Sequence, residues 1–195
     1  MSLTLPEISQ LFDHLGARLY GGEAITQREH ALQAAWSAEQ AGEEDSLIIA
    51  CLLHDLGHLL FEQNDADLAS GKDDLHQFKI IPFLRGLLPP EVTEPIRLHV
   101  DAKRYLCQHE AAYYEALSAA SKMSLALQGG IMDATAASAF ATHPYASQAI
   151  ALRRYDDAAK VVGLITPPFS HFLPTLTALA ERTAATCAST TPPPY

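Results

Sequence analysis

Hydrophobic residues recur along the chain mostly at helical spacing, and no stretch shows the clean alternation of a half-buried strand. Alanine and leucine, which favour helices, are abundant. The stretch from Leu47 to Leu60 is apolar on nearly every side, which is typical of a central helix. The pattern therefore predicts an all-α fold with this helix in its core.

Local signals mark where other helices begin and end. Thr26 and Glu29 form a capping box, Asp45 can cap the central helix, and Asp73 or Asp74 can cap a later one. We expect helices at about 6–19, 26–40, 47–60, 75–86, 90–99, 110–128 and 134–160, with a loop at 63–72 and an interruption of the last helix near Pro144. Prolines recur after residue 166, so we expect a core domain at 1–165 and a Pro-containing C-terminal tail at 166–195, partly packed or loosely ordered.

Composition narrows the class of protein. The 195 residues are enough for one domain with a sizeable core, and the formal net charge of −10 argues against a nucleic-acid binder. The apolar stretch from Leu47 to Leu53 is too short to cross a bilayer, and the N-terminus lacks a signal-peptide pattern. Cys51, Cys107 and Cys187 are too sparse for a disulfide framework. We expect a cytoplasmic protein without nucleic-acid or membrane partners.

The strongest local signal is the dipeptide His54-Asp55, which lies at the end of the apolar stretch. An aspartate buried inside an apolar helix costs free energy unless a partner compensates its charge. A bound cation is one such partner, and a His–Asp hydrogen bond at a helix end is another. The dipeptide alone favours the hydrogen bond.

Other histidines and aspartates reverse this preference. The chain has nine histidines, and several of them lie on expected helices among apolar residues. Taken singly, each is explained as a satisfied histidine or a solvated carboxylate. Together they provide six candidate metal ligands on five helical segments: His30, His54, Asp55, His76, His99 and Asp156. Imidazole and carboxylate ligands suit one or two first-row transition metals, whereas calcium prefers oxygen ligands.

The order of these six residues resembles the HD-domain superfamily, in particular its dinuclear branch. The likeness extends over roughly residues 18–165 to the mixed-valent diiron oxygenases, especially the PhnZ-like phosphonate-cleaving group and more distantly myo-inositol oxygenase. It implies an HD-domain helical bundle that holds two iron ions, Fe(II) and Fe(III), between its helices. It also implies that Asp55 bridges the ions, with His30, His54 and Asp156 completing one site and His76 and His99 the other.

Three basic residues can reach the same site. His58, Lys103 and Arg153 each lie three or four residues from a candidate ligand, so each shares a helix face with it. A phosphonate or phosphate needs such donors, and Ser121 and Ser124 can add hydroxyl groups. The ordinary alternatives are surface salt bridges for the lysine and the arginine, and surface or packing roles for the serines.

Tyr20 and Glu23 flank two glycines, which allow unusual backbone torsions. The resemblance implies a lid in which Tyr20 occupies a metal position until substrate arrives, while Glu23 meets a cationic amine of the substrate. The alternative is a simple interhelical turn with a packed tyrosine. The residues alone give the two interpretations comparable weight.

The resemblance implies an oxidoreductase that uses O2 to cleave the carbon–phosphorus bond of a small 1-hydroxyalkylphosphonate. The substrate would be 2-amino-1-hydroxyethylphosphonate or an N-methylated relative, and the products a carboxylic acid and phosphate. Tyr20, Glu23, His58 and Lys103 would take part in catalysis. Glu23, His58, Lys103, Ser121, Ser124 and Arg153 would bind the substrate.

Two other functions use the same scaffold. A metal-dependent HD phosphohydrolase acting on a nucleotide or another phosphate ester would need the same ligands to activate water. A non-catalytic sensing module is the third hypothesis, which the complete ligand set disfavours. The sequence leaves the oligomeric state open.

Overall fold

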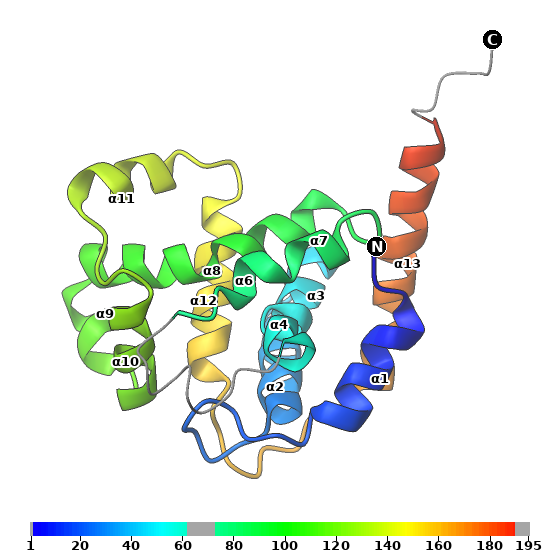
Figure 1. Ribbon diagram of the computed structural model, residues 1–195, viewed down its shortest axis with the longest axis horizontal. Coiled ribbons are helices and arrows are strands. Elements are labelled where there is room, and N and C mark those ends of the chain that lie inside the picture. Colours follow the sequence, from blue (N-terminus) through cyan, green and yellow to red (C-terminus); the bar gives the residue numbers. More distant parts are fainter. Residues whose placement is uncertain (1, 62–72, 190–195) are drawn as a thin grey trace.

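The computed structural model describes residues 2–61 and 73–189, and this part of the chain is all-α, as the sequence pattern predicts (Figure 1). It contains two isolated β-bridges and no strands. The helices are α1 (Leu5–Leu15), α2 (Gln27–Gln40), α3 (Asp45–Leu53), α4 (Leu56–Leu60), α6 (His76–Lys79), α7 (Ile81–Leu84), α8 (Pro90–His109), α9 (Ala111–Ala116), α10 (Ala119–Leu127), α11 (Ala134–Ala141), α12 (Ala146–Ala158) and α13 (Phe169–Ser189).

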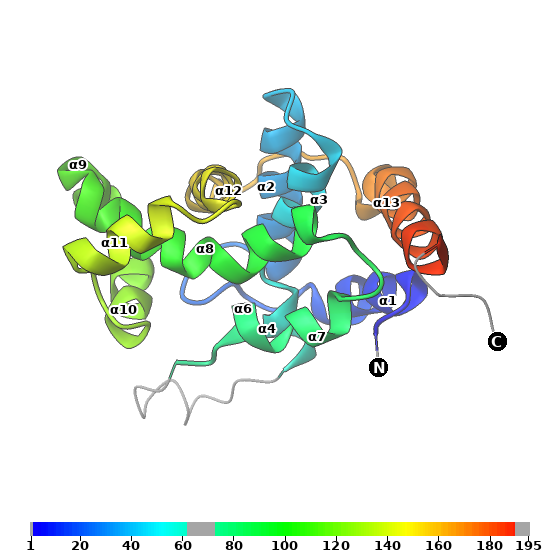
Figure 2. The same ribbon diagram turned by 90° about the horizontal axis from the view of Figure 1, so that it is seen from above.

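The core is centred on α3, in which every residue from Leu47 to Leu53 is buried. Helices α2, α8 and α12 each pack against α3, and α12 also packs against α2 and α8. In both views α9, α10 and α11 gather toward one end of α8, whereas α1 and α13 lie on the other side of α2 and α3 (Figure 1 and Figure 2). The four central helices therefore meet where the candidate ligands lie.

The observed N-cap residues can be compared with the helix caps that the sequence predicts. The capping box is confirmed, because the Thr26 hydroxyl accepts from the Glu29 N–H while the Glu29 carboxylate accepts from the Thr26 N–H. The predicted cap at Asp45 is wrong: Glu44 is the N-cap residue, and Asp45 is the first residue of α3. A carboxylate in the first turn still favours the helix through its dipole.

The helix predicted at 47–60 is interrupted at the His54-Asp55 dipeptide. Helix α3 ends at Leu53 and α4 begins at Leu56, with Asp55 between them at φ −103° and ψ 11°. Gly57 brings α4 close to α6, since a Cβ at this position would lie 2.6 Å from the carbonyl oxygen of His76. The interruption and the close approach place the dipeptide beside the start of α6.

The helix predicted at 75–86 consists of two short helices, α6 and α7. Its N-cap residue is Leu75, so the prediction of Asp73 or Asp74 as the cap is wrong. Both carboxylates nevertheless accept a backbone N–H two residues later. The predicted loop at 63–72 lies outside the described residues.

Helix α8 is longer than predicted and continues past His99 to His109, because buried residues such as Leu106 extend its apolar face. The helix predicted at 110–128 is divided into α9 and α10. The interruption near Pro144 is confirmed, since α11 ends at Ala141 and α12 begins at Ala146.

The sequence pattern does not predict α13, which lies in the segment expected to be a tail. Phe172, Leu176 and Leu179 are each at most 1 % exposed and belong to the main hydrophobic core. Their spacing of four and three residues places them on one helix face, and their burial outweighs the helix-interrupting effect of Pro174. None of the described helices combines the length and apolar character needed to cross a membrane.

Candidate metal centre

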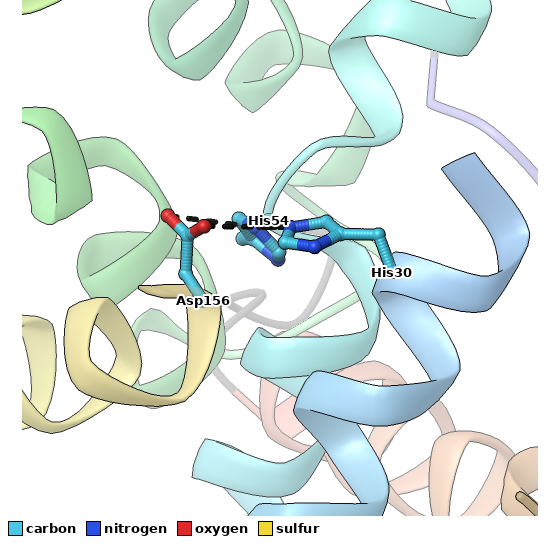
Figure 3. Close-up of side chains that lie close together, drawn as sticks. All are labelled: His30, His54 and Asp156. Atoms are coloured by element: carbon cyan, nitrogen blue, oxygen red, sulfur yellow. Dashed lines mark hydrogen bonds and ion pairs between the residues drawn. The ribbon is translucent and has the colours of Figure 1, made fainter. Parts of the chain in front are cut away.

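Three buried side chains from different parts of the bundle form the first cluster (Figure 3). His30 lies on α2, His54 directly follows α3, and Asp156 lies on α12; each is at most 2 % exposed. His30 Nε2 lies 3.1 Å from His54 Nε2 and 3.4 Å from Asp156 Oδ1. The three side chains point toward one another, so a single metal ion can contact all of them.

The second cluster is formed by Asp55, His76 and His99, all of which are buried. His76 Nε2 lies 3.2 Å from Asp55 Oδ1 and 3.2 Å from His99 Nε2. His99 Nε2 lies 3.7 Å from the same Asp55 oxygen. These three groups can also contact one metal ion.

Asp55 joins the two clusters through its separate carboxylate oxygens. Oδ2 lies 3.4 Å from His54 Nε2 and 3.7 Å from His30 Nε2, whereas Oδ1 faces His76. Burial would raise the pKa of Asp55, yet His54 and His58 hold it well below its usual range, which keeps the carboxylate ionised. One oxygen toward each cluster is the arrangement that a bridging ligand requires.

The structure thus brings all six predicted ligands together, and the proton positions of the four imidazoles indicate what they can bind. Each ring places Nδ1 within 2.8 Å of an oxygen that can only accept a hydrogen bond. The acceptors are the carbonyl of Ala159 for His30, of Cys51 for His54 and of Ile96 for His99, and the Asp74 carboxylate for His76. When neutral, as a metal ligand must be, each ring therefore carries its proton on Nδ1 and exposes a lone pair on Nε2.

The Nε2 atoms of His30 and His54 lie 3.1 Å apart, and those of His76 and His99 lie 3.2 Å apart. In the metal-free protein a proton can lie between the members of each pair, because Asp55 raises the pKa of both His54 and His76 despite their burial. A metal ion can take the place of that proton, and imidazoles whose Nδ1 is anchored in this way are typical metal ligands. The donor set therefore fits two metal ions, one in each cluster. The ligand role of each residue stays a prediction.

Arg153 is directed at the carboxylates rather than into open space. Its Nη1 donates to Asp156 Oδ2 at 2.8 Å, and its Nε donates to Asp157 Oδ2 at 3.0 Å and to the Tyr113 hydroxyl at 3.1 Å. Burial would raise the pKa of Asp156, but the charge of Arg153 holds it well below its usual range. Arg153 thus orients a candidate ligand, and its predicted contact with substrate stays a prediction.

Lys103 is 2 % exposed and donates from Nζ to Ser124 Oγ at 2.9 Å. Burial, together with the nearby charge of Arg153, lowers the pKa of Lys103 to about 7. An anion placed beside this ammonium group would favour its charged form. Lys103 and Ser124, two of the predicted substrate-binding residues, are thus in direct contact, and their binding of substrate stays a prediction.

Glu23 has two partners that the sequence pattern does not single out as site residues. Its Oε1 accepts from Ser118 Oγ at 2.7 Å and lies 3.6 Å from Lys160 Nζ, which also donates to Ser121 Oγ at 2.9 Å. Lys160 lies four residues after Asp156, and this spacing could have identified it as a site residue. No local spacing identifies Ser118, because its partner Glu23 is 95 residues away in the sequence.

Tyr20 covers the first cluster. Its ring stacks on His30 with centroids 3.8 Å apart, and its hydroxyl donates to Asp156 Oδ1 at 3.4 Å. Burial and the charge of Asp156 raise the pKa of the phenol well above its usual range, so the hydroxyl stays protonated. Gly22 has φ +83°, a value that L-amino acids rarely adopt, and it shapes the turn after Tyr20.

His58 lies at the edge of the second cluster. Its Nε2 is 3.8 Å from Asp55 Oδ1, its Nδ1 is 2.8 Å from Asp74 Oδ2, and its side chain is 24 % exposed. It is thus more accessible than the four imidazoles inside the clusters, and a bound molecule can reach it.

Comparison with known proteins gives this centre a chemical context. The chain is 38% identical to a [1-hydroxy-2-(trimethylamino)ethyl]phosphonate dioxygenase (glycine-betaine-forming) from Leisingera caerulea, over 90% of this chain and 89% of that protein. It is 42% identical to a hydroxymethylphosphonate dioxygenase from Gimesia maris, over 77% of this chain and 75% of the relative.

A third relative, the uncharacterized protein L432 of Acanthamoeba polyphaga mimivirus, is 32% identical over 85% of this chain and 76% of its own length. No protein-family model matches the chain. The two named relatives match most of the sequence. The chain therefore belongs to the family of phosphonate dioxygenases, which are oxidoreductases.

Proposed function

We propose that this protein uses O2 to cleave the carbon–phosphorus bond of a small 1-hydroxyalkylphosphonate, giving a carboxylic acid and phosphate. The observation that carries the proposal is the pair of His/Asp clusters joined by Asp55, in a chain that belongs to the phosphonate dioxygenase family. The overall conversion balances with one O2 consumed for each phosphate released.

The metal ions that we propose are two irons in the mixed-valent Fe(II)/Fe(III) state. One would be held by His30, His54 and Asp156, the other by His76 and His99, with Asp55 shared between them. When bound, the iron pair would supply the redox chemistry that activates O2. The protein would supply the position of the substrate and the balance of charge.

The phosphonate group is proposed to bind on the side where basic and hydroxyl groups gather. Lys103 with Ser124 and Lys160 with Ser121 form two ammonium–hydroxyl pairs, each at 2.9 Å. Both serines lie on α10, so the two pairs are held by one rigid element. A doubly charged phosphonate would compensate the cost of keeping these ammonium groups partly buried.

Tyr20 and His58 are proposed to act on the substrate from opposite clusters. The Tyr20 hydroxyl donates to Asp156, a proposed metal ligand. Tyr20 is proposed to be a lid residue that leaves this position when the substrate binds. Nε2 of His58 carries a lone pair, because Nδ1 faces Asp74, and it can accept the proton of the substrate hydroxyl. This proton transfer would favour the alkoxide form of the substrate.

Glu23 is the residue on which the choice of substrate depends. Of the two named relatives, one acts on a trimethylammonium substrate and the other on hydroxymethylphosphonate, which has no amine. A carboxylate near the substrate favours a cationic amine, but here Lys160 lies 3.6 Å away and partly balances the charge of Glu23. We propose an amino or N-methylated hydroxyphosphonate and include hydroxymethylphosphonate in the test.

The test is turnover of three substrates with and without O2: hydroxymethylphosphonate, 2-amino-1-hydroxyethylphosphonate and its N-trimethyl relative. We expect phosphate release from at least one of them in air, with equal amounts of O2 consumed, and none under anaerobic conditions. Undiminished phosphate release without O2 would contradict the proposal. Release from a nucleotide or another phosphate ester under those conditions would favour the phosphohydrolase.

The reducing cytoplasm is the proposed place of action. Cys51 and Cys107 are buried free thiols, and among the described residues no disulfide links them. Fe(II) is also retained more readily under reducing conditions. This proposal is independent of the substrate.

A further inference from the structure

Asp74 lies between two imidazoles and uses a different oxygen for each. Oδ1 lies 2.8 Å from His76 Nδ1, and Oδ2 lies 2.8 Å from His58 Nδ1. The two rings stack with centroids 4.0 Å apart and an interplanar angle of 28°, so their Nδ1 edges can face the same carboxylate. Because an ionised carboxylate only accepts, both rings donate their Nδ1 proton to it.

His76 needs this partner for a reason that lies in the helix geometry. His54 and His99 each anchor Nδ1 on the carbonyl three residues earlier, in the preceding turn of their own helices. His76 is the first residue of α6, so no preceding helical turn offers it such a carbonyl. The Asp74 carboxylate takes the place of that missing acceptor.

The backbone is bent to make this contact possible. Leu75, between Asp74 and His76, has φ 53°, the left-handed conformation that residues other than glycine rarely adopt. In this turn Asp74 Oδ1 accepts from the His76 backbone N–H at 3.2 Å as well as from the ring. The strained turn and the carboxylate together set the direction of the His76 ring.

We propose that Asp74 is a positioning residue that orients His76 and His58 as one unit, with both Nε2 lone pairs directed at the second cluster. The two Nε2 atoms lie 3.2 Å and 3.8 Å from Asp55 Oδ1. The inference rests on the proposed function, because it assumes that the second cluster binds a metal ion. One side chain would thus control a metal ligand and the proton acceptor beside it.

The substitution Asp74→Asn distinguishes the hydrogen-bonding role of Asp74 from an effect of side-chain size. The asparagine keeps the shape of the side chain but has one accepting oxygen, and its NH2 group would face an Nδ1–H of the other ring. One imidazole must then turn or move its proton to Nε2, where the proton blocks the lone pair. The loss should fall on the second cluster, since no contact joins Asp74 to His30, His54 or Asp156 among those found in the described residues.

The test is calorimetric titration of metal-free protein with Co²⁺ in the absence of O2. We expect the wild type to bind two equivalents of Co²⁺. In Asp74→Asn the equivalent bound at the second cluster should bind about 10–100-fold more weakly, and the equivalent at the first cluster should bind as in the wild type. Asp74→Glu keeps the negative charge and should recover part of the affinity. Asp73→Asn is the matched control, because it removes the same charge one residue away and should bind both equivalents as the wild type does.

Cooperative thermal unfolding of each metal-free variant would show that the fold is intact, and Asp74→Glu provides the same comparison if the asparagine variant does not fold. Wild-type affinity for both equivalents in the Asp74 variants would overturn the inference. Equal weakening of both equivalents, or equal weakening by Asp73→Asn, would overturn it as well. A wild type that binds no Co²⁺ would refute the metal centre of the proposed function, and the inference with it.

Discussion

Replacing Asp55 with asparagine is expected to reduce hydroxyphosphonate turnover by at least about 10³-fold, because the residue is proposed to connect both metal sites. An amide retains the size of the side chain but lacks the negative charge that lies between the four imidazoles. Only a carboxylate places one oxygen atom toward each of the two clusters. Phosphate release and bound metal should be measured on the same protein sample, and metal content should fall together with activity.

Asp101→Asn is the control for this substitution. Asp101 lies on α8 and forms an ion pair with Arg104 outside the two clusters, so its loss should leave metal content and turnover close to those of the wild type. An Asp55→Asn protein that binds two metal ions per chain and keeps more than about a tenth of wild-type turnover would contradict the bridging role.

The second large effect is on stability. Arg153→Met is expected to lower the free energy of unfolding of the metal-free protein by about 3–5 kcal/mol, because it leaves the buried carboxylate of Asp156 without its charged partner. The Asp157 carboxylate loses the same partner. Denaturant unfolding near pH 7 measures the change.

Arg154→Met is the matched control, since it removes the same charge from the neighbouring residue. The Arg154 side chain is 50 % exposed and pairs with Glu110, which is also exposed, so the loss should stay within about 1 kcal/mol. Equal effects of the two substitutions would show that the buried ion pair does not determine the stability of this region.

Much of the metal centre could be predicted from the sequence because its residues depart from their surroundings. A histidine or an aspartate among buried apolar residues needs a partner, and six of them on separate helices indicate a shared one. His30 and His99 were recognisable in this way. The interruption between His54 and Leu56 was not, because it depends on how α4 packs against α6 through Gly57.

Contacts between distant segments explain the remaining differences. The pairs of Glu23 with Ser118 and of Lys103 with Ser124 join residues on separate helices or loops, and no local spacing predicts them. The sequence indicates only a helix-capping role for Asp74, so its contacts with two imidazoles could not be predicted. Helix α13 contains a proline that suggests a loop, and only its packing against the core stabilises it as a helix.

X-ray diffraction at wavelengths on either side of the iron absorption edge would test the central claim most directly, on crystals of protein purified without chelators. Two anomalous peaks are predicted, both in contact with Asp55. One should lie among His30, His54 and Asp156, and the other should lie beside His76 and His99. The absence of both peaks, or a single peak that does not contact Asp55, would contradict a carboxylate-bridged dinuclear iron centre.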